Sequence, residues 1–77
     1  ALDNETAYNL ENSLLNLENL TLITVTHKLI KNILNRYDEI IVMKNGKIIE
    51  KGNFEDLINI KGYFYSLYTI QNDTLSL

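Results

Sequence analysis

The 77-residue sequence contains no cysteine and only one histidine, so it offers neither a disulfide framework nor the ligands of a zinc cluster. Basic residues are also scarce, because seven Lys and Arg stand against ten Asp and Glu and give a net charge of −3. No basic stretch occurs, which argues against a nucleic-acid binder or an anionic-membrane binder. A soluble protein of a reducing, cytosolic compartment fits these absences best.

Long hydrophobic segments are missing as well. The longest apolar run, Ile40 to Met43, is far shorter than the roughly 20 residues of a membrane-spanning helix, and no signal-peptide pattern opens the chain. A chain of this length has room for one small core, and ordering costs of roughly 1.5 kcal/mol per residue nearly cancel the burial available. The chain begins at Ala1 without an initiator Met. We therefore expect it to be part of a larger domain.

Three elements are predicted in the first half of the chain. Apolar residues at intervals of three and four predict a helix over residues 4–18, with Asp3 as its N-cap. The β-branched run at 21–26 predicts a strand that ends at His27. Helical spacing returns after it and predicts a short helix around 29–34.

The second half carries the clearest local signals. Strand-like runs at 39–44 and 47–51 flank Asn45-Gly46, a pair favoured in tight hairpin turns. Asn53 is a suitable cap for a brief helix, and the aromatic residues after Gly62 predict a last amphipathic helix. Residues 71–77 are expected to form a fraying tail.

The order of these elements predicts an α/β fold. Residues 27–38 are long enough for a crossover, so strands 21–26 and 39–44 are expected to lie parallel in a βαβ unit, to which the hairpin adds an antiparallel strand. Because apolar residues do not alternate cleanly with polar ones at 21–26, this strand is expected to be covered on both faces, by neighbours that are not evident in this chain.

The residues alone indicate no complete catalytic apparatus. His27 is the single histidine, a residue type suited to proton transfer near neutral pH, and it follows a predicted strand at the edge where α/β sheets bind ligands. A hydrogen-bonded structural role for His27 is nevertheless the commoner reading of such a residue. Asp3 is fully explained as a cap, and no nucleophilic triad, carboxylate pair or Gly-rich loop is present.

Taken together and in order, the segments closely resemble the C-terminal part of an ABC-transporter ATP-binding domain. The resemblance covers residues 1 to about 71, and the aromatic segment that closes the chain is most similar to the exporter branch. Its segments are 1–3, 22–29, 38–52, 54–57 and 62–68.

This resemblance implies a P-loop NTPase fold, with residues 1–77 as a partial ATP-binding domain running from the D-loop to the C-terminal helix. It implies that Ala1, Leu2 and Asp3 end the D-loop, which couples the two sites of a head-to-tail dimer. It also implies that His27 is the switch histidine that contacts the γ-phosphate of ATP. The phosphate loop, Gln loop, family signature and acidic strand would all lie upstream of Ala1, and no metal ligand is expected within the chain.

The implied function is coupling of ATP binding and hydrolysis to export, with ATP and Mg²⁺ as cofactors of the parent. Its partners would be a second ATP-binding domain and transmembrane domains, at the cytosolic face of the membrane. The chain alone is expected to be catalytically inactive and to self-associate or domain-swap. Two alternatives stay open: a free-standing α/β interaction module that docks through residues 63–70, and a soluble accessory ATPase of the same family.

Overall fold

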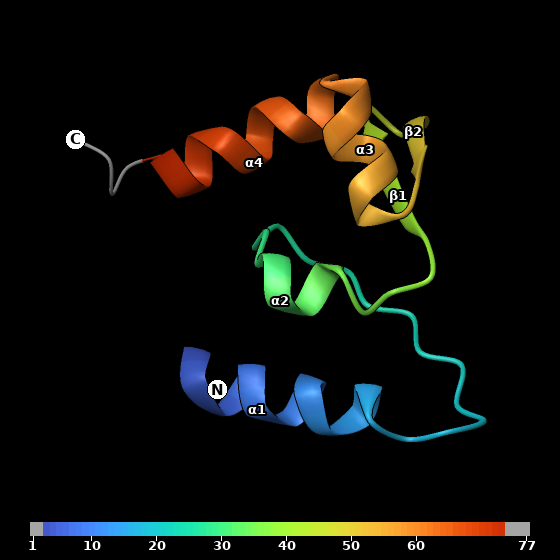
Figure 1. Ribbon diagram of the computed structural model, residues 1–77, viewed down its shortest axis with the longest axis vertical. Helices are drawn as coiled ribbons and strands as arrows, with labels where there is room; N and C mark the ends of the chain where they lie inside the picture. Colours follow the sequence, from blue (N-terminus) through green and yellow to red (C-terminus); the bar gives the residue numbers. More distant parts are fainter. Residues whose placement is uncertain (1–2, 74–77) are drawn as a thin grey trace.

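A computed structural model describes residues 3–73 of the chain. Figure 1 shows the hairpin, α3 and α4 gathered at one end of the molecule, α1 at the opposite end, and α2 between them. The elements in chain order are α1 (Asn4–Leu15), α2 (Lys31–Leu34), β1 (Ile40–Lys44), β2 (Lys47–Gly52), α3 (Phe54–Ile60) and α4 (Tyr63–Asp73). Among the described residues, no helix is both long enough and apolar enough to cross a membrane.

The predicted hairpin is confirmed. Strands β1 and β2 pair antiparallel, from Ile40 opposite Gly52 to Lys44 opposite Lys47. The two turn residues, Asn45 and Gly46, have φ angles of 53° and 76°. Positive φ at both positions is what a type I′ turn requires, and Asn followed by Gly adopts it at little cost. The turn chemistry therefore determines this part of the fold locally.

The predicted cap of α3 is also confirmed. The Asn53 side chain accepts a hydrogen bond from the backbone N–H of Asp56 at 2.8 Å, and the Asp56 carboxylate accepts one from the backbone N–H of Asn53 at 3.3 Å. This reciprocal capping box satisfies two backbone donors that the first helical turn leaves free. Lys61 then adopts a left-handed conformation and ends the helix.

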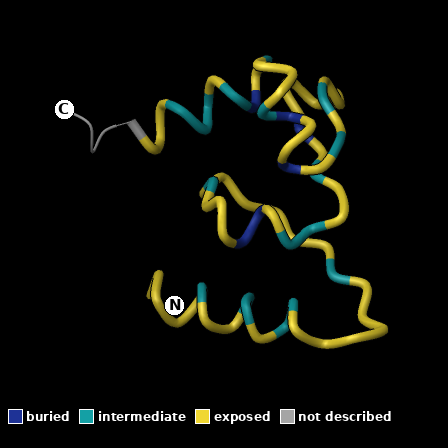
Figure 2. The backbone as a smooth tube through the Cα atoms, in the orientation of Figure 1, coloured by how far each residue is buried: buried dark blue, intermediate teal, exposed yellow. Residues whose placement is uncertain are grey.

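The core lies between the hairpin and the last two helices. Its buried residues include Leu57, which is 1% exposed, and Phe64, which is 2% exposed. Phe54 meets Phe64 and Tyr68 edge to face, with ring centroids 6.0 and 5.3 Å apart, a favoured geometry for aromatic rings. Figure 2 shows buried residues in this region and in α2, whereas α1 has no buried residue. The full cluster is Leu34, Val42, Phe54, Leu57 and Phe64.

A carboxylate from the hairpin caps α4. Glu50 on β2 accepts hydrogen bonds from the backbone N–H groups of Tyr63 at 2.9 Å and Phe64 at 2.7 Å. A negative charge at a helix N-terminus is favoured by the free N–H groups and by the helix dipole. A Cβ atom added at Gly62 would lie 2.0 Å from the carboxylate. Glycine at this position therefore leaves the space that the cap occupies.

Replacing Glu50 with alanine is expected to lower the free energy of unfolding of the chain by about 1–2 kcal/mol, because α4 loses two charge-assisted bonds. Gly62→Ala is expected to have a similar effect by displacing the same carboxylate. Urea unfolding followed by circular dichroism measures both. Glu18→Ala is the control, since it removes an equal charge from an exposed turn. Equal losses for Glu50→Ala and Glu18→Ala would show that the cap contributes nothing.

The strand predicted at 21–26 is wrong for this structure. These residues form an irregular connection between α1 and α2, and β1 pairs only with β2 in the part of the chain described. Ile23 and Val25 are 87% and 96% exposed. A strand requires backbone partners on a neighbouring strand, and β-branched residues alone do not supply them. The expected βαβ unit is therefore also wrong here, and the α/β fold consists of helices around a two-stranded hairpin.

Two helix boundaries also differ from the prediction. Helix α1 ends at Leu15 rather than near residue 18, and Leu10, on its apolar stripe, is 51% exposed. Helix α4 continues through Asp73, where a fraying tail was expected to begin at residue 71. Side chains near the end of α4 bond to the backbone of residues 27 and 29.

Candidate functional site

His27 lies in the connection that leads into α2 and is exposed. The backbone around it is held by two side chains. The Thr26 hydroxyl accepts a hydrogen bond from the backbone N–H of Lys28 at 3.0 Å, which closes a local turn. Gln71 of α4 bonds the backbone of residues 27 and 29. The imidazole therefore projects from a restrained backbone into solvent.

Asp3 is the N-cap of α1, as predicted. Its carboxylate accepts a hydrogen bond from the backbone N–H of Thr6 at 2.7 Å. This bond lowers the pKa of the Asp3 carboxyl, because it stabilises the ionised form. Asp3 is exposed, so the same carboxylate is accessible to a partner. The other two predicted D-loop residues, Ala1 and Leu2, lie outside the described residues.

One contact brings the two predicted motifs near each other. The Lys28 ammonium, next to His27, donates a hydrogen bond to the Asn4 side chain, next to Asp3. An open groove of 630 Å³ runs along this contact, lined by α1, the segment before α2 and the end of α4. The structure therefore places the start of α1 beside the histidine segment, although 24 residues separate Asn4 from Lys28.

Other polar contacts attach α1 to the rest of the chain. The Tyr37 hydroxyl donates to Glu11 and lies 2.6 Å from the Thr24 hydroxyl. Burial, with a further contribution from the Glu11 bond, raises the pKa of Tyr37. Arg36 donates to Asn12 and Asn16 on the same face of α1. These hydrogen bonds attach α1 to the segments on either side of α2, while Leu14 and Leu15 of the helix are half-buried.

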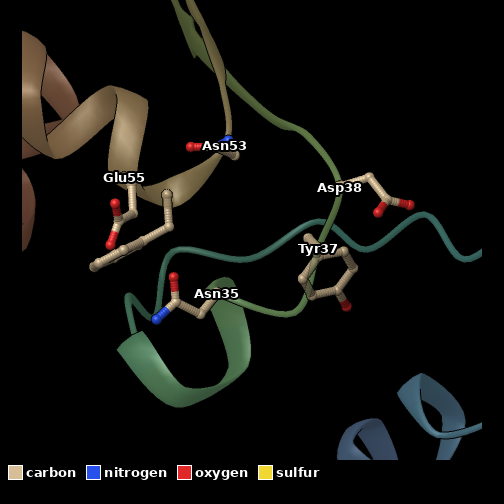
Figure 3. A pocket seen from close by; sticks show the side chains of 6 residues that line it. Asn35, Tyr37, Asp38, Asn53 and Glu55 are labelled. Carbon is tan, nitrogen blue, oxygen red and sulfur yellow. The ribbon is translucent and has the colours of Figure 1, made fainter.

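A second hollow lies between the α2–β1 connection and the start of α3 (Figure 3). It has a volume of 310 Å³ and is lined mainly by polar side chains. In Figure 3 the carboxylates of Asp38 and Glu55 lie on different sides of the hollow and do not converge. Among the described residues, no cluster of three His, Cys, Asp or Glu side chains could hold a metal ion.

The chemistry available around His27 is limited but specific. The described residues offer an imidazole and a nearby ammonium toward an anionic ligand, but no acidic cluster toward Mg²⁺. An imidazole N–H is a suitable donor to a phosphoryl oxygen. A complete Mg·ATP site would therefore need ligands from outside residues 3–73.

Sequence reasoning missed Gln71 and Asn72, because both fall where a tail was expected. The only local signal for them is the continued helical pattern after Gly62. Their contacts with residues 27 and 29 join positions more than 40 residues apart in sequence, so a local pattern does not indicate them.

Comparison with known proteins shows which proteins this chain is similar to. The chain is 39% identical over 71 residues to an uncharacterized ABC transporter ATP-binding protein of Bacillus subtilis, a match covering 91% of this chain and 11% of the relative. It is 44% identical over 73 residues to an ATP-dependent lipid A-core flippase of Neisseria meningitidis serogroup A, covering 94% and 11% respectively. A pediocin PA-1 transport/processing ATP-binding protein of Pediococcus acidilactici is 36% identical over 66 residues, covering 86% and 9%.

No family model matches the chain, and no solved structure matches it significantly. The chain spans about a tenth of the length of the curated relatives described above. Those relatives agree with the family resemblance that the sequence shows. The chain therefore matches a fragment of an exporter-type ABC ATP-binding domain.

Proposed function

We propose that this chain forms part of the ATP-binding domain of an ABC exporter that couples ATP hydrolysis to transport across a membrane. The observation that carries the proposal is 39–44% identity over 91–94% of the chain to an ABC transporter ATP-binding protein and a lipid A-core flippase. The match extends over nearly the whole chain. The domain would act at the cytosolic face of the membrane.

His27 is proposed as the switch histidine of this site. Its role would be to donate a hydrogen bond to the γ-phosphate and so to position ATP for attack by water. Phosphoryl transfer depends on positioning and on donors aimed at charge on the transferred group. Bound Mg²⁺ would neutralise charge on the β- and γ-phosphate oxygens. The exposure of His27 and the restrained backbone beneath it support this role.

Asp3, with Ala1 and Leu2, is proposed as the end of the D-loop. An exposed carboxylate at the start of a helix is available to a second ATP-binding domain, whose site it would couple to this one. The contact between Lys28 and Asn4 supports communication between the two motifs within one domain. The proposed partners are a second ATP-binding domain in a head-to-tail dimer and transmembrane domains.

The direct test is ATP hydrolysis by the full-length protein that carries this chain, measured as phosphate release in detergent or lipid. We expect saturable turnover that requires Mg²⁺. A purified, folded protein that releases no phosphate above background under these conditions would contradict the proposal. The relatives do not favour the alternative of a free-standing interaction module.

The 77-residue chain by itself is expected to bind ATP no tighter than about 1 mM, equivalent to about 4 kcal/mol. The reason is that one imidazole without metal ligands or a phosphate-binding loop provides few contacts. Isothermal titration calorimetry with Mg·ATP measures this affinity, and a His27→Ala chain is the control. Micromolar binding of ATP to the chain would contradict the expectation, and the His27→Ala chain would then show whether the imidazole contributes to it.

The isolated chain is also expected to self-associate. Its exposed apolar residues, and the segment 21–26 that has no strand partner among the described residues, would be buried against a second copy. Val25, 96% exposed, is the most exposed of the large hydrophobic residues described. Val25→Lys is therefore expected to shift the chain toward monomer in sedimentation experiments. Thr21→Lys adds the same charge in the same segment without removing apolar surface. A compact wild-type monomer at high concentration, or equal effects of both variants, would contradict the expectation.

A further inference from the structure

We propose that Gln71, near the end of α4, is a positioning residue that fixes the backbone from which the His27 side chain projects. The Gln71 Nε2 atom donates a hydrogen bond to the His27 carbonyl at 2.7 Å, and its Oε1 atom accepts one from the Leu29 N–H at 2.9 Å. Both ends of one side-chain amide are therefore used on one short backbone segment. The inference rests on the proposed role of His27 in ATP hydrolysis.

The geometry of this contact makes it a two-point restraint. A side-chain amide is planar, so its donor and acceptor cannot move independently, and together they fix the distance and orientation of residues 27 and 29. One residue of a parallel neighbouring strand bonds an extended segment through the same pair of groups. Gln71 thus supplies a strand-like contact where the segment has no strand partner in the described chain.

Neighbouring contacts strengthen the restraint on both sides. Asn72 donates to the Leu29 carbonyl at 3.4 Å and to the Tyr68 carbonyl at 2.8 Å. The Thr26 hydroxyl holds the Lys28 N–H. Hydrogen bonds therefore hold backbone groups of residues 27, 28 and 29. The His27 side chain is the part of this segment left to face a ligand.

Helix α4 is itself anchored, so it can transmit a fixed position to His27. Phe64 is buried in the core at the start of the helix, and Tyr68 packs against the core one turn later. Glu50 caps the N-terminus of the helix. Gln71 lies about one turn beyond Tyr68. The core, α4 and the histidine segment therefore form one continuous chain of contacts.

The test in the full-length protein compares Gln71→Met with Gln71→Glu. Methionine keeps the length of the side chain but removes both hydrogen bonds, and we expect it to lower kcat about tenfold with little change in the KM for ATP. Glutamate keeps an acceptor for Leu29 but loses the donor to the His27 carbonyl, so an intermediate loss is expected. Asn59→Met, which removes an exposed amide from α3, is expected to leave turnover unchanged.

A double-variant cycle separates positioning from general destabilisation. If Gln71 acts through His27, Gln71→Met adds no further loss of turnover in a His27→Ala background. An equal loss in both backgrounds would overturn the proposal. Thermal unfolding of each variant is measured alongside, because a melted helix would lower turnover in either background.

Amide hydrogen exchange at Leu29 tests the clamp without reference to activity. We expect exchange to be about fivefold faster in Gln71→Met and nearly unchanged in Gln71→Glu. Unchanged exchange in Gln71→Met would overturn the clamp. If His27→Ala leaves ATP turnover intact, the proposed function of His27 fails; faster Leu29 exchange in Gln71→Met would then still support the clamp.

Discussion

Replacing His27 with alanine in the full-length protein is expected to lower ATP turnover by about 10²- to 10³-fold while leaving most ATP binding in place. The imidazole would contribute one donor aimed at the γ-phosphate, and losing one preorganised donor raises the barrier of the chemical step. Ground-state affinity is expected to change little, because most nucleotide contacts would come from other parts of the domain. Phosphate release gives turnover, and equilibrium binding of a fluorescent ATP analogue gives affinity.

Two further variants sharpen this test. His27→Gln retains an N–H donor on a side chain of different shape and is expected to recover part of the lost turnover. Lys31→Ala removes an exposed charge four residues away on α2 and serves as the control. Unchanged turnover in His27→Ala would remove the switch role. A parallel loss of ATP binding would show instead that the variant disturbs the nucleotide site as a whole.

Replacing Leu57 with alanine is expected to lower the free energy of unfolding of the chain by about 2–5 kcal/mol. Leu57 is 1% exposed at the centre of the cluster formed by the hairpin, α3 and α4. Truncation leaves a cavity that the surrounding rings fill only in part. Because a single small core supplies only about 3–5 kcal/mol, this loss would unfold much of the chain at room temperature.

Urea unfolding and thermal melting measure the effect of Leu57→Ala. Ile60→Ala is the matched control, since it shortens a branched aliphatic residue on the same helix, where the side chain is 59% exposed. It is expected to cost well under half as much. Equal losses would mean that the core does not lie where the structure places it. Loss of α4 in Leu57→Ala should also release the Leu29 amide from Gln71.

Local chemistry alone was sufficient for the hairpin and for the caps of α1 and α3, whereas the Glu50 cap of α4 bridges 13 residues and was not predicted. The Asn45-Gly46 turn, the Asn53 capping box and the Asp3 cap depend on residues within about four positions of one another. Such features are readable because the backbone preferences and the hydrogen-bond partners are both local. The resemblance to ABC-transporter ATP-binding domains was likewise read from the amino-acid sequence, and the relatives agree with it.

Features that depend on contacts between distant segments were predicted less well from the sequence. The β-branched segment 21–26 was predicted as a strand, but strand formation depends on partners that are not among the elements described. The apolar spacing at the start of the chain predicted a helix, but it did not indicate that none of the residues of α1 is fully buried. The bond between Gln71 and the backbone of His27 spans 44 residues, so no local pattern indicates it.

The sequence by itself determined the hairpin turn, the caps of α1 and α3, the aromatic residues of α4 and the relationship to ABC ATP-binding domains. Each of these depends on residue types at short, ordered spacings. Only the tertiary structure decided which apolar residues are buried, that 21–26 lacks a partner, and that Gln71 holds the segment around His27. These depend on which distant segments meet in space, because burial and long-range hydrogen bonds are properties of the assembled chain.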